Sequence, residues 1–190
     1  FKAVTEFYEN AVKMNKYTSI AFLQTPKLFL RYREFLKKDK WTIEEFKRSV
    51  ERIKKYLLRN KLTKDFNLIT YAGKSLKEFK GSIEYSGTFK NLHYENSKGI
   101  AVMLGVMGLE VINFQYSENE LFSKFDFIGT EIFGKYDISI SEMAKLVEKN
   151  LEFLENYARI VNDKDYYLWM KLADYEEFLI SFNDNFLFEK

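Results

Sequence analysis

Residues 96–109 read NSKGIAVMLGVMGL and form the least polar stretch of the chain. The ten residues from Ile100 to Leu109 carry no charged or hydrogen-bonding side chain, although glycines stand at 99, 105 and 108. The stretch is shorter than the roughly 18 apolar residues that span a bilayer. Its glycine spacing matches no phosphate-binding fingerprint, because Lys98 comes before the glycines and not after them. We therefore predict a buried element at the centre of the domain.

Two secondary structures fit this stretch. As a strand, it is a short apolar run bounded by Asn-Ser-Lys-Gly and by Gly108. As a helix, it has Ser97 as N-cap and apolar residues at spacings of three and four: Ile100, Met103, Leu104, Met107 and Val111. The glycines and valines favour a strand, whereas the length, the methionines, the alanine and the leucine favour a helix. A helix on a sheet is the preferred interpretation.

The positions of glycine and proline predict the fold class. All eight glycines lie between Gly73 and Gly134, and the single proline is Pro26. Both flanks are therefore expected to be helical, and the middle third to contain strands and turns. We predict one domain over 1–190, helical in 1–63 and 139–182 and sheet-rich in 66–134. The fold class is α+β, with helices from both chain ends packed on a small, mostly antiparallel sheet.

Helix start signals support this division. Capping boxes stand at Thr42–Glu45 and Ser139–Glu142, and Trp41 with Phe46 would form a hydrophobic staple around the first. They predict a helix from 43 to about 60 and another of about 20 residues after 139. Further helices are expected at 1–16, from Thr25-Pro26 to about 39, and at 164–181.

The middle third contains the predicted strands. Residues 67–79 fit either a helix or a strand, and 87–94 favour a strand. Alternating apolar residues predict an antiparallel hairpin of 110–116 with 121–128. One face of this hairpin is expected to carry Ile112, Phe114 and Tyr116 from its first strand, and Leu121, Phe125 and Phe127 from its second.

Composition excludes several kinds of site. The chain has no cysteine and one histidine, His93, so disulfides, thiol catalysis and most zinc sites are excluded. On a strand, His93 would face solvent, opposite Leu92 and Tyr94, and we interpret it as a surface residue. No catalytic residue, metal or cofactor is assigned.

Among enzymes, the sequence comes nearest to a metal-dependent nuclease, through Asp65 and the triplet Glu78-Phe79-Lys80. A solvated charged face is the preferred interpretation of these residues.

Charge is distributed unevenly along the chain. Residues 31–64 hold 13 Lys/Arg against 5 Asp/Glu, whereas 137–190 hold 6 against 12. Such asymmetry is typical of a molecule with one basic and one acidic face. The basic segment gives an alternative function, nucleic-acid binding, with these candidate residues: Arg31, Arg33, Lys47, Arg48, Lys54, Lys55 and Arg59. The acidic segment suits a protein inhibitor or scaffold that acts by surface complementarity.

Residues 85–129, which include LHYENSKGIAVMLGVMGLEVINFQYSENELFSKFDFIG at 92–129, give a family resemblance. Their order of strand, glycine-containing apolar segment and hairpin resembles the ligand-binding sensor domains of the 4-vinyl-reductase type and the haem-nitric-oxide-binding fold. The resemblance implies an apolar cavity beside the sheet, lined by Met103, Met107, Phe114 and Phe125. It does not extend to haem, because Tyr94–Lys98 departs from the propionate-binding motif and no upstream histidine could serve as proximal ligand.

Together these observations predict a non-enzymatic regulatory or binding domain. It would recognise a small apolar ligand or a protein partner at a junction of sheet and helix. We also expect the protein to be cytoplasmic, to make no membrane contact and to be able to form homodimers.

Overall fold

The computed structural model describes residues 41–71, 73, 75–119, 121–135 and 138–160, without the side chains of 155–160. In chain order the described elements are α4 (Ile43–Arg59), β1 (Thr63–Tyr71), η1 (Leu76–Glu78), β2 (Lys80–Gly87), α5 (Lys90–Val106), β3 (Leu109–Ser117), β4 (Phe122–Gly129) and α6 (Ile140–Ile160). The predicted α+β class is confirmed. The expected helices within 1–40 and 164–181 lie outside the described residues.

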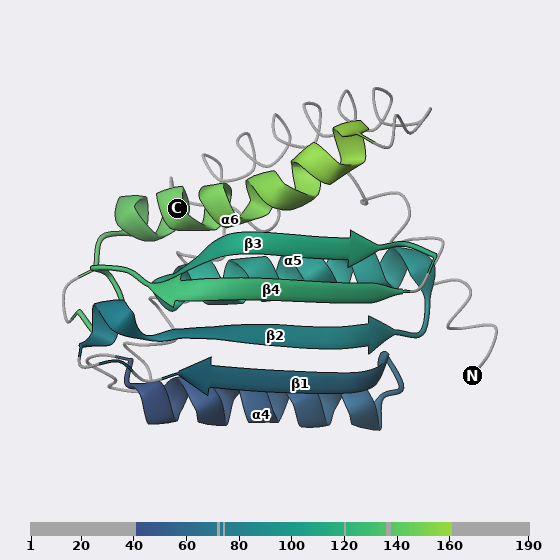
Figure 1. The fold of residues 1–190 in the computed structure, drawn as a ribbon, viewed down its shortest axis with the longest axis horizontal. Helices are drawn as coiled ribbons and strands as arrows, with labels where there is room; N and C mark the ends of the chain where they lie inside the picture. The colour runs from purple at the N-terminus through teal and green to yellow at the C-terminus, as the bar shows by residue number, and fades with distance from the viewer. Residues whose placement is uncertain (1–40, 72, 74, 120, 136–137, 161–190) are drawn as a thin grey trace, which may run out of the picture.

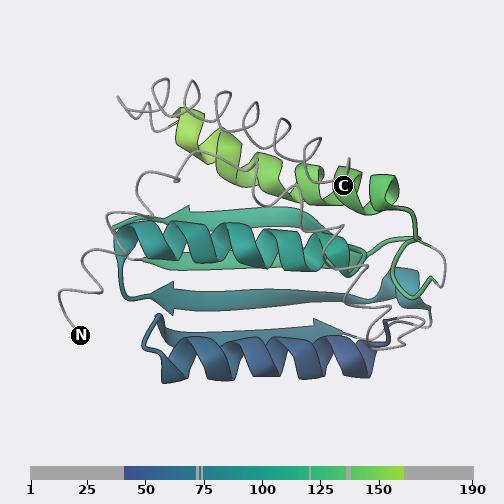
Figure 2. The same cartoon turned by 180° about the vertical axis from the view of Figure 1, so that it is seen from behind.

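The four described strands form one antiparallel sheet in the order β1-β2-β4-β3 (Figure 1). Helices α4 and α5 cover the same face of this sheet, α4 over β1 and α5 over β3 and β4, and α5 also contacts β2 (Figure 2). Helix α6 packs against α5 and β3. Helix α5 contacts both the sheet and α6, so the most apolar stretch of the chain lies between them.

Cross-strand register separates the two faces of the sheet. The face toward the helices carries apolar partners such as Ile83 opposite Phe125 and Val111 opposite Phe127. The other face is mainly polar, with Lys124 opposite Glu84 and an ion pair between them at 3.0 Å, but Ile69 and Tyr71 of β1 are also exposed there. One apolar and one solvated face is the usual pattern of an antiparallel sheet. The core therefore lies between the sheet and its helices.

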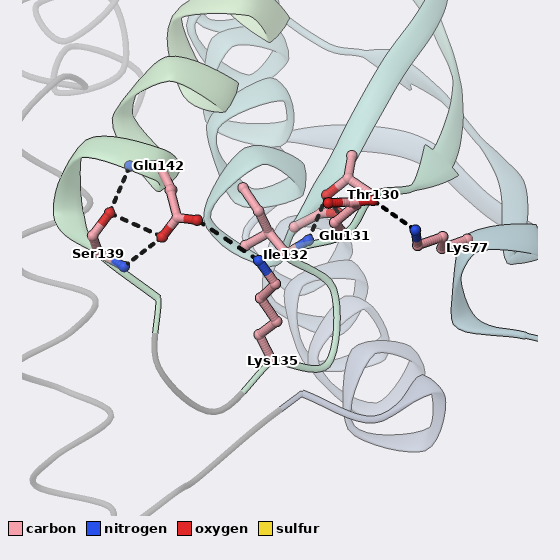
Figure 3. Close-up of polar contacts among 8 residues, drawn as sticks. Lys77, Thr130, Glu131, Ile132, Lys135, Ser139 and Glu142 are labelled. Atoms are coloured by element: carbon pink, nitrogen blue, oxygen red, sulfur yellow. Dashed lines mark hydrogen bonds and ion pairs between the residues drawn. The ribbon is translucent and has the colours of Figure 1, made fainter.

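Both predicted capping boxes are confirmed. The Thr42 hydroxyl accepts from the Glu45 amide at 3.2 Å, and the Glu45 carboxylate accepts from the Thr42 amide at 3.2 Å. Ser139 and Glu142 make the same reciprocal pair at 3.1 and 3.0 Å before α6 (Figure 3). These bonds satisfy backbone donors that have no partner inside the helix.

The loop between β4 and α6 is tied to the rest of the fold. Thr130 donates its hydroxyl to the Gly108 carbonyl at 2.7 Å, and the same hydroxyl accepts from the Ile132 amide at 3.1 Å (Figure 3). Lys77 of η1 forms an ion pair with Glu131 at 2.6 Å. The end of β4 is thereby held beside the turn that links α5 to β3.

The helix interpretation of the opening stretch is confirmed, but its predicted start was wrong. The helix begins at Lys90, so Ser97 is not an N-cap. The prediction of a strand over 87–94 was also wrong, because only Gly87 belongs to a strand and residues 90–94 are helical. Residues 67–79 comprise the second half of β1 and then η1.

The predicted hairpin is confirmed, with two corrections to its faces. A bulge lies between Val111 and Asn113, so Ile112 leaves the ladder and is 50% exposed, away from Phe114 and Tyr116. Leu121 lies in the turn with a φ of 52°, outside β4, and does not share the face of Phe125 and Phe127.

Candidate functional site

His93 lies on the first turn of α5 and is fully buried. The prediction that it faces solvent was wrong, because a helix and not a strand carries it. Its imidazole stacks on Tyr116 with ring centroids 5.4 Å apart and meets Tyr85 edge-on at 5.0 Å. Gly87 leaves room for it, since a Cβ there would lie 2.4 Å from His93 Nδ1.

Three fully buried hydroxyls accompany this imidazole, from Tyr85 on β2, Ser97 on α5 and Ser123 on β4. Ser97 Oγ lies 2.6 Å from Tyr85 Oη and 2.9 Å from Ser123 Oγ, and Ser123 Oγ lies 2.9 Å from His93 Nε2. Ser97 Oγ also donates to the His93 carbonyl at 2.9 Å. We call Tyr85, His93, Ser97 and Ser123 the His93 cluster.

The donor and acceptor roles depend on the tautomer of His93 and on which hydroxyl gives its proton to the His93 carbonyl, because Tyr85 Oη also lies 3.5 Å from that carbonyl. In the arrangement where Ser97 gives its only proton to this carbonyl, Ser97 accepts from both Tyr85 and Ser123. Ser123 has then used its proton and accepts from His93 Nε2–H. This assignment leaves His93 Nδ1 as an unprotonated acceptor, and it has no hydrogen-bond partner among the described residues.

The surroundings of the cluster keep it uncharged. Burial lowers the pKa of His93 to about 4, and a backbone hydrogen bond at Phe122, which favours the protonated ring, opposes that shift only in part. Burial likewise raises the pKa of the Tyr85 phenol far above its usual value, against the opposing effect of the serine hydroxyls. At neutral pH the cluster is therefore a set of neutral donors and acceptors.

A buried ion pair lies one turn further along α5. Lys98 is 2% exposed, its Nζ lies 2.7 Å from Glu95 Oε1, and it stands over the Tyr94 ring at 5.4 Å. Burial raises the pKa of Glu95, while Lys98 acts in the opposite direction. Tyr94 donates its hydroxyl to the Leu154 carbonyl at 3.0 Å, which joins this part of α5 to α6.

The four predicted pocket residues all lie in or against the core. Met103 and Met107 are buried on and just after α5, and Phe125 is fully buried on β4. Phe114 of β3 is partly buried, and its ring lies 4.6 Å from that of Phe125. The structure therefore brings Phe114 and Phe125 together at the sheet and places Met103 on the helix above.

The predicted nucleic-acid residues fall into two groups. Arg31 and Arg33 lie outside the described residues. The others are on α4, where Lys47, Arg48, Lys55 and Arg59 are exposed and Lys54 is partly buried.

The predicted nuclease residues are far apart. Asp65 pairs with Ser86 at one end of the β1–β2 ladder, whereas Glu78 stands just before Lys80, which pairs with Tyr71 at the other end. Six strand residues separate these ends, about 20 Å at about 3.3 Å per residue. Asp65 and Glu78 therefore do not share a metal ion.

Sequence reasoning assigned none of the four members of the His93 cluster to a site, and it interpreted His93 as a surface residue. Ser97 stands four residues after His93, so it shares that face of a helix, but this spacing is informative only once the helix is known to begin at Lys90. Ser123 alternates with Phe125 and Phe127 and is thus a polar residue at a core-facing position of β4. That alternation was the available signal.

Within the part of the chain that the structure describes, no helix combines the length and apolar character needed to cross a membrane. The chain matches no protein-family model, no curated protein and no solved structure.

Proposed function

We propose that this chain is a non-enzymatic regulatory or binding domain that holds a small, mainly apolar ligand between α5 and the sheet. The His93 cluster carries the proposal. Its four polar side chains are buried in an aromatic environment, where polar groups are costly unless all their hydrogen bonds are made. The resemblance of residues 85–129 to ligand-binding sensor domains supports the same location.

The cluster defines what the ligand must offer. His93 Nδ1 has no hydrogen-bond partner among the described residues, and in the arrangement given above it is an acceptor, so the ligand should carry one O–H or N–H group. The neighbouring rings of Tyr85, Tyr116 and Phe114 favour a flat apolar body. Small aromatic molecules with a single donor are therefore the expected class.

Indole and 1-methylindole test this chemistry, because they differ in the one N–H donor. Each is titrated into the isotope-labelled full chain while amide chemical shifts are followed. Indole should bind with shifts in α5, β2 and β4, at least about tenfold more tightly than 1-methylindole, since a buried acceptor would otherwise stay unpaired. Failure of both to bind, or equal affinities, would overturn the proposal.

Two variants locate the site. His93→Phe keeps a ring but removes Nδ1, and it should abolish the preference for indole. Asn113→Ala, on the exposed face of β3, is the matched control and should retain that preference. A preference that survives in His93→Phe would place the donor contact elsewhere and refute the assignment.

A further inference from the structure

Four cations form a line along α4. Arg48, Arg52, Lys55 and Arg59 follow each other at intervals of four, three and four residues, and all four side chains are exposed. This spacing places them on one face of a helix. They lie opposite the buried residues Phe46, Val50 and Leu57, which face the sheet. We call these four residues the α4 stripe.

The stripe contains a residue that the charge pattern of 31–64 did not single out. Arg52 fills the gap between Arg48 and Lys55 and makes the line continuous over about 16 Å, at about 1.5 Å per residue. Three carboxylates flank it: Glu44 and Glu45 precede Arg48 by four and three residues, and Glu51 is 4.0 Å from Lys55 with both side chains largely exposed. Such exposed pairs are weak, and α4 as a whole stays positive with six Lys/Arg against three Glu.

From this arrangement we infer that the α4 stripe binds the phosphate backbone of a nucleic acid without reading its bases. A line of about 16 Å spans several phosphates, and guanidinium groups form paired hydrogen bonds with phosphate oxygens. An α-helix also fits the major groove of a duplex. Figure 2 shows α4 at the margin of the fold with no other described element in front of it.

The same face fits a membrane surface poorly. Helices that lie on membranes insert a band of apolar side chains beside their cations. On α4 the large exposed apolar residues are Tyr56 and Leu58, which stand near the C-terminal end on opposite sides of the stripe. The other three turns of the helix therefore have no apolar band next to the cations.

The test measures binding of the full chain to labelled duplex DNA and single-stranded RNA of about 20 nucleotides by fluorescence anisotropy. Four phosphate contacts predict a slope of about −3.6 for log K against log salt on duplex DNA, or an affinity loss of about 10²-fold between about 50 and 200 mM. No binding of either nucleic acid at about 50 mM salt would overturn the inference.

Charge reversal assigns the binding to the stripe. Arg52→Glu with Arg59→Glu should weaken binding at least about tenfold and reduce the slope by about 2. Lys80→Glu with Lys145→Glu changes net charge equally at exposed positions on β2 and α6 and should have little effect. Equal losses in both pairs would show a response to net charge alone and would refute the site.

Two further measurements keep the result interpretable. Arg52→Gln with Arg59→Gln preserves helix propensity, and it should still lower the slope by about 2 if the reversed pair fails to fold. Vesicles containing phosphatidylserine and an acidic peptide are tested in parallel. Binding to either of these without binding to nucleic acid would overturn the inference. Indole binding is independent of the stripe and should be unchanged in all three double variants.

Discussion

Helices α4 and α5 have 17 residues each and lie on the same face of the sheet, yet their surroundings differ (Figure 2). In α4 three residues are buried, and the opposite side carries the α4 stripe. In α5 twelve residues are buried, because the sheet covers one side and α6 another. One helix is an amphipathic cover and the other is the centre of the core.

The comparison shows that a polar residue is more informative on a buried helix than on an exposed one. A charged residue on the outer face of α4 is ordinary and can be judged only as part of a pattern such as the stripe. A polar residue buried on α5 needs partners inside the protein, and His93, Ser97 and Lys98 each have one. Substitutions should therefore be tolerated on α4 and costly on α5, and the next four predictions test that contrast.

The largest effect is expected from introducing aspartate. Met103→Asp places an unpaired carboxylate in the core, at a cost of several kcal/mol, comparable to the whole stability of a domain. Arg48→Asp on α4 should change the free energy of unfolding by less than about 0.5 kcal/mol. Urea denaturation followed by circular dichroism measures both. A soluble, folded Met103→Asp variant would contradict the assignment of α5 to the core.

Asn150 tests the α6 side of α5. Its fully buried amide donates to the Ala101 and Leu109 carbonyls at 3.1 and 3.0 Å and accepts from the Val111 amide at 2.9 Å. Asn150→Leu removes the partner of the Leu109 carbonyl and of the Val111 amide and should lower stability by about 2–4 kcal/mol. Glu148→Gln, on the exposed side of α6, is the control and should be neutral in the same denaturation assay.

Acid should weaken the contact of α5 with the sheet. The folded-state pKa of His93 is about 4 against an unfolded value of about 6.5, so the unfolded chain binds more protons between these pH values. Stability is fully present above about pH 6.5 and should fall by about 3 kcal/mol as pH drops through this window to about 4. His93→Phe should flatten the decline between about pH 6.5 and 5. An unchanged decline there would show that another group is responsible.

The smallest effects come from two glycines of α5. A Cβ on Gly105 would lie 2.8–3.0 Å from side-chain and backbone atoms of Val147, so Gly105→Ala should cost about 1–3 kcal/mol. Gly99 has nothing within 4 Å of that position, and Gly99→Ala should stabilise by about 0.5–1 kcal/mol. Thermal melts of both variants should shift in opposite directions. A shift in the same direction would refute the close approach of α5 to α6.

Local sequence patterns were sufficient to predict the helices and strands that short-range interactions determine. The capping box at Thr42–Glu45 and the alternation in 110–128 predicted α4 and the hairpin, because caps and period-two patterns act within a few residues. The start of α5 was missed since Leu92, His93 and Tyr94 are all buried, which removes the polar face that marks a helix. The bulge at Ile112 adds one residue without a sequence signature and so shifted the predicted face.

The candidate site depended on contacts that no local pattern contains. Tyr85, Ser97 and Ser123 come from β2, α5 and β4, and they meet only after the strands have paired in their observed register. Arg52 was a different omission: its position on the stripe follows from helical spacing alone and could have been predicted.

The contacts of Asn150 also limit how the sheet can grow. Its side-chain amide bonds the Leu109 carbonyl and the Val111 amide, two groups that a fifth strand beside β3 would need. Helix α6 thus blocks strand pairing at this end of β3, and an unfolded neighbouring chain cannot pair with residues 109–111 and aggregate. Loss of the Asn150 amide would therefore lower stability and would also expose a strand edge that can associate with other chains.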